Sequence, residues 1–164
     1  MDVRPAVVAD AAAIAAVHTR TWQAAYAHVF GAERLAGIDA DRRRAGWERG
    51  IAAGETVFVA EADGRVVAFV SVGPSRDLDG VGELFAIYAL PEAWGTEAGR
   101  TLMQAGVEAL RTAGHAEAIL WVLEDNPRAR RFYEREGWLL DGARKEDEFL
   151  GVPAAEVRYR LTLG

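Results

Sequence analysis

The chain has 164 residues, a length that corresponds to one domain able to bury a full hydrophobic core. Hydrophobic residues make up 51% of it and charged residues 27%, which excludes intrinsic disorder. The net charge of −6 argues against nucleic acid as a partner, because a phosphate backbone calls for a basic face. There is no cysteine, so disulfides, cysteine nucleophiles and thiolate metal sites are excluded.

Metal and membrane binding are also disfavoured. The three histidines, His18, His28 and His115, show no metal-ligand spacing, so we predict no metal site. No run of eighteen apolar residues occurs, so we predict no membrane partner. The alanine-rich stretch from Ala6 to Val17 lacks a basic leader and is interrupted by Asp10, which argues against a signal peptide. We therefore expect a cytoplasmic protein.

The N-terminal part of the chain predicts one strand and two helices. The strand spans Met1–Val7, and Pro5 suits an edge position within it. Apolar residues at helical spacing predict a long helix that starts at the N-cap Asp10 and is broken by Gly31. A second helix is predicted from Ile38 to Ala53.

The period then changes to that of strands. Segments Thr56–Glu61 and Arg65–Val72 are rich in valine and phenylalanine, and Asp63-Gly64 between them predicts a hairpin turn. A further strand is predicted over Glu83–Leu90.

The C-terminal half alternates helices and strands. Its predicted elements are a helix over Thr96–Thr112, a strand over Ala118–Leu123, a helix from Asn126 to Gly137, and strands over Trp138–Leu140 and Glu156–Leu161. The strand–helix–strand unit implies a parallel crossover, whereas the hairpins imply antiparallel pairing. The expected fold is α/β (α+β): a mixed, mostly antiparallel central sheet of about seven strands, with helices on both faces.

A glycine-containing turn joins a strand to a helix between Gly82 and Leu110. A helix N-terminus there presents unpaired N–H groups, which form a ready site for a pyrophosphate. Gly95 and Gly99 would let a ligand approach the backbone closely. Taken alone, the pattern fits a plain tight turn equally well.

A second stretch, Leu120 to Trp138, reads LWVLEDNPRARRFYEREGW. Its residues fit the signature N-x-x-A-x-x-F-Y-E-x-x-G-[FW] at Asn126, Ala129, Phe132, Tyr133, Glu134, Gly137 and Trp138. With the glycine turn, the chain resembles the GNAT superfamily of N-acetyltransferases, which use acetyl-CoA. The resemblance covers nearly all of the chain. It implies a single acetyltransferase domain over residues 1–164.

The resemblance places the pyrophosphate loop at Trp94, Gly95, Thr96, Glu97, Ala98 and Gly99, followed by Arg100. Trp94 stands where the family usually has glutamine or arginine, and Glu97 where it has glycine. The charge of Glu97 opposes a bound pyrophosphate, which Arg100 could partly compensate. A second hypothesis is therefore an acyl-CoA-binding or regulatory domain of this fold without significant catalysis.

The resemblance also implies roles in catalysis. Tyr133 would protonate the departing CoA thiolate, the backbone N–H of Ala89 would stabilise the oxyanion, and Asn126 would hydrogen-bond the cofactor. Glu83 is the candidate general base that removes the proton from the amine, directly or through water. The alternatives are structural: a core tyrosine, a helix N-cap at Asn126 and a hydrogen-bonded glutamate at a strand start.

The acceptor is expected to be a primary amine on a small molecule or a peptide. Trp22 and Tyr26 lie four residues apart on one helical face and are candidate substrate-binding residues, with core packing as the alternative. Arg128, Arg130 and Arg131, which follow Asn126, could meet the phosphates of CoA, with solvent as the alternative. A homodimer is the commonest expectation for oligomeric state. A dinucleotide-dependent oxidoreductase is disfavoured, because no G-x-G-x-x-G follows the first strand.

Overall fold

A computed structural model describes residues 1–164. It shows one seven-stranded mixed sheet in the order β1-β2-β3-β4-β5-β7-β6. The strands are β1 (Asp2–Pro5), β2 (Thr56–Ala62), β3 (Arg65–Pro74), β4 (Gly82–Ala89), β5 (Glu117–Leu123), β6 (Leu139–Phe149) and β7 (Val152–Thr162). The predicted fold class is confirmed.

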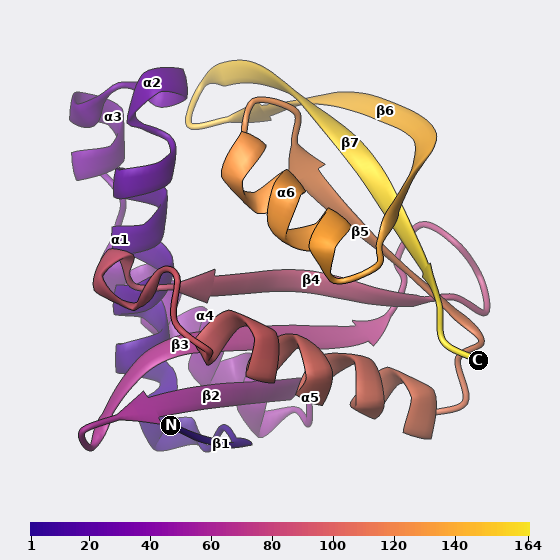
Figure 1. Cartoon of the computed structure of the whole chain (residues 1–164). Coiled ribbons are helices and arrows are strands. Elements are labelled where there is room, and N and C mark those ends of the chain that lie inside the picture. Colours follow the sequence, from indigo (N-terminus) through magenta and orange to yellow (C-terminus); the bar gives the residue numbers. More distant parts are fainter.

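The helices cover both faces of the sheet, as expected (Figure 1). Behind the sheet in that view lie α1 (Ala11–Ala25) and α4 (Ala40–Ala52), and in front lie α5 (Ala98–Thr112) and α6 (Pro127–Arg135). The short helices α2 (Ala27–Phe30) and α3 (Ala32–Ala36) extend from the end of α1, and two 3₁₀ turns, η1 (Val8–Asp10) and η2 (Pro91–Ala93), complete the chain.

The first predicted helix is interrupted earlier than expected. Tyr26 lies outside the helical region of the backbone and separates α1 from α2, so the single long helix ending near Gly31 was wrong in detail. Asp10 occupies the N-cap position of α1, but its carboxylate makes no bond to that helix. It accepts instead from the backbone N–H of Val7 and pairs with Arg4 on β1 at 2.8 Å. A nearby guanidinium was a stronger partner for this carboxylate than a helix N–H.

The first three strands pair as antiparallel neighbours. β1 is an edge strand, which agrees with its Pro5. Asp63 and Gly64, both with positive φ, form the predicted turn between β2 and β3. Between β3 and β4 the register shifts by one residue, because Phe85 is an extra residue on β4.

The parallel crossover also occurs as predicted, and it has an unusual consequence. β4 and β5 pair over only two positions, Gly82 with Ala118 and Glu83 with Ile119. Beyond Glu83 the two strands diverge, and β4 runs towards α1 while β5 turns up beside α6 (Figure 1). The sheet is therefore open between β4 and β5 at their carboxyl ends.

The last hairpin is much longer than predicted. β6 extends to Phe149 instead of Leu140, and β7 starts at Val152 instead of Glu156. The added part of β6 is the charged run RKEDE, which shows no apolar alternation because β6 is an edge strand with both faces largely exposed. Leu150 and Gly151, both with positive φ, make the tight turn at its tip.

The base of the opening is tightly packed, and this gives a stability test. A Cβ at Gly82 would lie 2.9 Å from the Leu110 side chain and 3.2 Å from that of His115. Gly82→Ala should lower the free energy of unfolding by about 1–3 kcal/mol through overpacking. Gly46→Ala, in α4, is the matched control: its Cβ meets no atom closer than 3.9 Å. It should stabilise by about 0.5–1 kcal/mol. Urea midpoints measure both, and equal shifts of the two variants would contradict this packing.

Candidate active site

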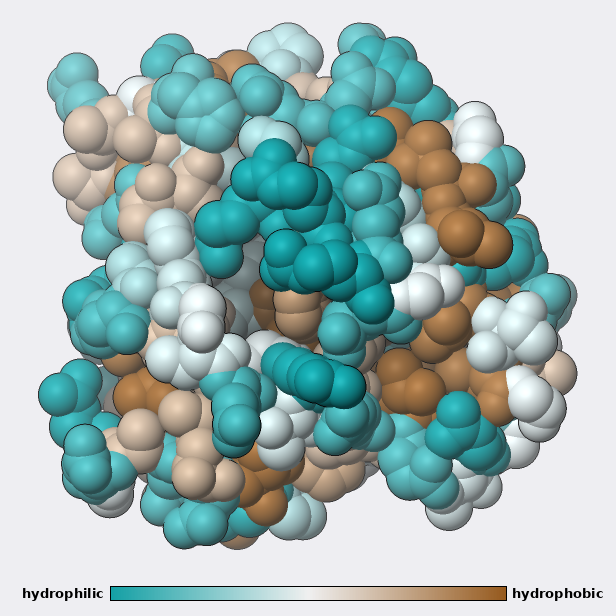
Figure 2. Space-filling model, in the orientation of Figure 1, coloured by the Kyte–Doolittle hydropathy of each residue, from teal (hydrophilic) through white to brown (hydrophobic).

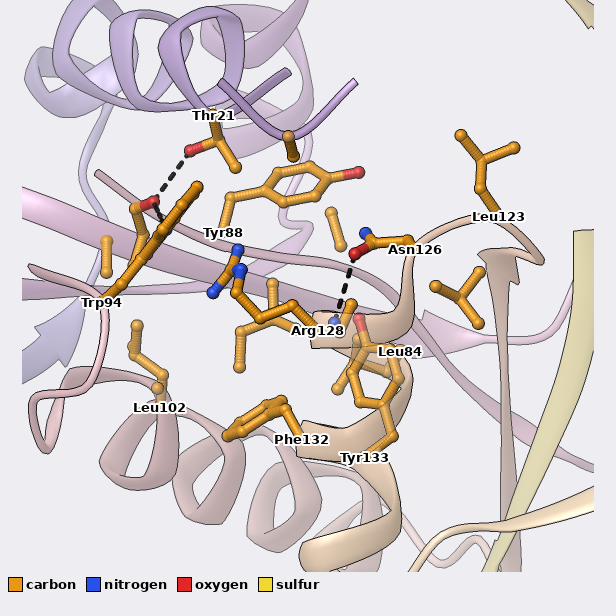
Figure 3. Close-up of a pocket in the computed structure, with 18 of the residues that line it drawn as sticks. Thr21, Leu84, Tyr88, Trp94, Leu102, Leu123, Asn126, Arg128, Phe132 and Tyr133 are labelled. Atoms are coloured by element: carbon orange, nitrogen blue, oxygen red, sulfur yellow. Dashed lines mark hydrogen bonds between the residues drawn. The ribbon is translucent and has the colours of Figure 1, made fainter. Parts of the chain in front are cut away.

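The divergence of β4 and β5 opens a cleft of about 580 Å³. Its walls come from the open edge of β4, the end of β5, α1, the loop before α5, α6, and single positions on β6 and β7. Most lining residues are apolar (Figure 3). On the surface, the same face of the molecule is hollowed near its centre, where apolar atoms show between strongly hydrophilic residues (Figure 2). A pocket that is mostly apolar with a few polar groups is typical of a small-molecule site.

Unpaired donors gather where α5 begins. The backbone N–H groups of Gly99 and Arg100 have no acceptor in the protein, while that of Ala98 bonds to the Thr96 hydroxyl at 3.3 Å. Gly95 has a φ of +76°, which only glycine adopts readily, and the turn brings it to the cleft wall. This end of the cleft thus presents free N–H groups and the positive end of a helix dipole.

Two residues of the predicted cofactor loop do not line the cleft. The side chain of Glu97 is exposed at the N-cap position of α5 and makes no capping bond. Ala98 is buried in the core. The remaining predicted loop residues Trp94, Gly95, Thr96, Gly99 and Arg100 all line the cleft. The carboxylate that would oppose an anion therefore lies outside the cavity.

Trp94 joins the loop to both α1 and α6. Its indole N–H donates to the carbonyl of Ala89 at 2.8 Å, and the hydroxyl of Thr21 donates to the same oxygen at 2.9 Å. The guanidinium of Arg128, from the first turn of α6, lies 3.5 Å from the centre of the Trp94 ring (Figure 3). Arg128 makes no hydrogen bond or ion pair, and partial burial lowers the pKa of its guanidinium. It is a cation in the cleft without an anionic partner.

The backbone of β4 offers further donors along its open edge. The N–H of Leu90 bonds to Val67 on β3 at 2.8 Å, so it points away from the cleft. Because alternate residues of a strand direct their N–H groups to opposite edges, that of Ala89 points towards the opening. Ala89 lines the cleft.

Asn126 is buried beside the cleft, and its amide is partly occupied. Its oxygen accepts from the N–H of Ala129 at 3.2 Å, so it is the N-cap of α6, as the structural alternative predicted. Its NH₂ group donates to the hydroxyl of Tyr26 at 3.1 Å. Since the amide carries two N–H bonds and two acceptor lone pairs, one of each remains for a ligand.

Tyr133 reaches the cleft from α6. Its ring is 6% exposed, and its hydroxyl makes no hydrogen bond to another protein group. Burial raises the pKa of this hydroxyl, so it stays protonated at neutral pH and can donate a proton.

Glu83 lies at the base of the opening, where β4 and β5 still pair. It is buried, and its carboxylate accepts from the Ser75 hydroxyl at 3.0 Å. Burial raises its pKa, an effect that the Ser75 hydrogen bond partly offsets. Glu83 is not among the residues that line the cleft, so a proton would have to reach it through an intervening group or water.

Trp22 and Tyr26 line the cleft, as predicted for substrate-binding residues. They also pack with Phe30: the Trp22 ring stacks on it at 5.7 Å, and Tyr26 contacts it edge-on. His18, four residues before Trp22 on the same helical face, does not line the cleft and stacks on the Tyr88 ring. The structural alternative for Trp22 and Tyr26 is therefore observed, and their role in binding a substrate stays a prediction.

Sequence reasoning missed two carboxylates of the cleft, Glu136 at the end of α6 and Glu156 on β7. Glu156, on β7 opposite Leu123, lines the cavity. Burial raises its pKa. On the sequence it is one of three charged residues that alternate with apolar ones on the last strand, and no local signal separates it from Arg158 and Arg160. Only the neighbouring strands show that its position faces the cleft.

The rest of the fold shows neither a metal cluster nor a membrane-spanning helix. No group of three or more histidine and acidic side chains is placed to hold a metal ion. None of the helices combines the length and apolar composition needed to cross a bilayer.

Comparison with known proteins finds acetyltransferases by both sequence model and sequence identity. The sequence model described as "Acetyltransferase (GNAT) family" matches residues 16–138, most of the chain. The uncharacterized N-acetyltransferase YuaI of Bacillus subtilis is 36% identical over 130 residues, which cover 77% of this chain and 74% of YuaI.

Solved structures share the fold. An N-acetyltransferase from Staphylococcus aureus Mu50 superposes with a TM-score of 0.79 over 99% of this chain and 98% of its own, at 19% identity. The yncA acetyltransferase of Salmonella typhimurium, solved with acetyl-CoA, gives a TM-score of 0.75 over 99% and 94%, at 24% identity. The match of the family model across most of the sequence, together with YuaI, shows that the chain belongs to the GNAT family of acetyltransferases.

Proposed function

We propose that this enzyme transfers the acetyl group of acetyl-CoA to a primary amine by direct attack within a ternary complex. The observation that carries the proposal is the cleft between β4 and β5, which brings an anion-binding helix end and the free hydroxyl of Tyr133 to one cavity. The structure of the yncA relative with its cofactor acetyl-CoA supports this choice of donor.

Acetyl-CoA fits the polarity of the cleft. Its pyrophosphate would accept from the free N–H groups of Gly99 and Arg100 at the start of α5. Arg128 would leave the face of Trp94 and bind a phosphate, which supplies a donor group in place of the glutamine or arginine that the family usually has at position 94. Asn126 would bind the pantetheine chain with its remaining amide groups.

The exposed position of Glu97 weakens the hypothesis of a domain without significant catalysis. That hypothesis rested on a carboxylate in the pyrophosphate loop. Because Glu97 does not line the cleft, its repulsion of a bound anion is screened by solvent.

The reaction follows from the groups in the cleft. The neutral amine nitrogen attacks the thioester carbonyl carbon, and the N–H of Ala89 stabilises the negative oxygen that forms. The C–S bond then breaks, the thiolate leaves with the bonding electrons, and Tyr133 protonates it. The nitrogen loses its extra proton through water to Glu83. The products are the acetamide and CoA.

The cytoplasmic location and the homodimer stay predictions from the sequence. The amine acceptor is proposed as a small molecule or peptide on the basis of the cleft alone.

The cofactor proposal is tested first by binding. Calorimetric titration should show acetyl-CoA binding and no NAD binding. Arg128→Ala should weaken acetyl-CoA binding by about tenfold, because a charge-assisted hydrogen bond is lost. Arg131→Ala is the matched control, since Arg131 is an exposed arginine of the same helix outside the cleft. Equal losses in both variants would mean that only the general charge of α6 matters.

If Tyr133 is the general acid, its substitution should affect turnover but not the binding of acetyl-CoA. Tyr133→Phe should lower kcat by about a hundredfold or more, the scale of general acid catalysis, without weakening acetyl-CoA binding. Release of CoA thiol in the presence of a primary amine that the wild type acetylates measures turnover. Tyr159→Phe serves as control, because its hydroxyl bonds to Arg130 and Glu134 outside the cleft. A parallel loss of binding and turnover in Tyr133→Phe would contradict a role as acid.

The role of Glu83 predicts a pH dependence. Its raised pKa means that the carboxylate becomes an active base only as the pH rises through that value. At pH values above the pKa of Glu83 and below that of the amine, Glu83 is ionised while most of the amine is still protonated. A base is needed most in this range. Glu83→Gln should therefore lose most activity in that range and approach the wild type as the amine deprotonates by itself. A kcat/KM profile parallel to that of the wild type would exclude Glu83 as the base.

A further inference from the structure

The end of the cleft beside β7 has a different character from the end beside α5. Glu156 and Trp121 both line it, and they come from the adjacent strands β7 and β5. The side chain of Glu156 is only 16% exposed. The indole N–H of Trp121 donates to the carboxylate of Asp77 at 2.7 Å, which fixes the ring. An oriented aromatic face and a buried carboxylate thus meet at one place.

A cation from the chain itself occupies this place. Lys145, the only lysine of the protein, lies on β6 directly opposite Glu156. Its ammonium is 3.9 Å from the Glu156 carboxylate and 4.3 Å from the centre of the Trp121 ring. An ammonium in this geometry is stabilised by both the carboxylate and the negative face of the indole.

The surroundings favour a positive charge and bind Lys145 only weakly. Asp77, Glu83 and Asp147 each raise the pKa of Glu156 by repulsion, while Lys145 lowers it. A second cation, Arg158, lies 5.6 Å from the centre of the same Trp121 ring, but Asp141 pairs with it at 2.6 Å. Acidic groups therefore outnumber the one unneutralised cation, the Lys145 ammonium, near Glu156. The Lys145 side chain is 40% exposed, and an ion pair at such a position contributes little to stability. An incoming ammonium that replaces Lys145 would keep the largely buried Glu156 carboxylate paired, so the exchange leaves no buried charge without a partner.

We propose that Glu156 and the face of Trp121 form the subsite that binds the ammonium of the acceptor, and that Lys145 fills this subsite until the acceptor displaces it. The proposal rests on the proposed function and names its substrate class: a cationic primary amine with an apolar body. The bound ammonium loses one proton to solvent before its neutral nitrogen attacks the thioester, and the second proton leaves after the attack, through water to Glu83. The apolar body would lie along Tyr88 and Phe149, which line the adjoining cleft wall. Amines that carry a carboxylate or sulfonate would be repelled by Glu156.

The exchange of cations can be measured without turnover. Sulfo-NHS acetate acylates only the Lys145 amine and the N-terminus, and mass spectrometry distinguishes the two. Benzyltrimethylammonium, a cation that cannot be acylated, should speed the labelling of Lys145 severalfold and leave that of Met1 unchanged. Glu156→Gln should speed Lys145 labelling without any added cation. Glu146→Gln is the matched control, because Glu146 is an exposed carboxylate on β6 next to Lys145. Unchanged or slower Lys145 labelling with the cation would overturn the exchange.

Turnover then tests the substrate class. With acetyl-CoA, phenethylamine should be acetylated with a kcat/KM at least about tenfold above that of taurine, because both amines can bond to Glu156 but the taurine sulfonate is repelled by it. Glu156→Gln should raise the KM for phenethylamine. Lys145→Met should lower that KM, whereas Lys145→Arg, which keeps a cation, should leave it near the wild-type value.

The two proposals fail in different ways. Acetylation of phenethylamine and taurine at equal kcat/KM, with a KM insensitive to Glu156→Gln, would overturn the subsite and leave the acetyltransferase intact. Cation-dependent labelling of Lys145 without binding of acetyl-CoA would support the subsite and overturn the proposed function.

Discussion

The short pairing of two parallel strands determines the rest of this structure. β4 and β5 are joined only at Gly82 and Glu83 and then separate, so the sheet cannot close at their carboxyl ends. Beyond that point the backbone groups of β4 that face away from β3 lack a strand partner and must find others. Some do so within the protein: the Ala89 carbonyl accepts from Thr21 and Trp94. The groups that remain free define where a ligand can bind.

The cleft that results is electrically asymmetric. On the α5 side it presents unpaired backbone N–H groups and the guanidinium of Arg128, which suit an anionic donor. On the β7 side it presents Glu156 and the face of Trp121, which suit a cationic acceptor. Tyr133 lines the same cleft with an unbonded hydroxyl. The cleft therefore suits an anionic donor at one end and a cationic acceptor at the other, although the protein carries a net charge of −6.

The sequence predicted what local patterns encode. Asp63-Gly64 defined a hairpin, and Asn126-Pro127 defined the start of α6, because turns and caps depend on a few adjacent residues. The extent of β6 could not be read, because an edge strand needs no apolar alternation. Glu156 could not be predicted as a cleft residue for another reason. Whether its side chain faces the cleft depends on the divergence of β4 from β5, which is a tertiary property. Glu83 was placed at a strand start correctly, but its separation from the cleft was not visible.

We propose that the edge of β4 and the start of α5 bind acetyl-CoA. Amide NMR of the labelled protein titrated with acetyl-CoA tests it most directly, because it observes the free N–H groups themselves. We expect the largest shifts at the amides of Ala89, Gly99 and Arg100. Shifts concentrated elsewhere, for example around the Arg4–Asp10 pair on β1, with these three amides unchanged, would contradict it.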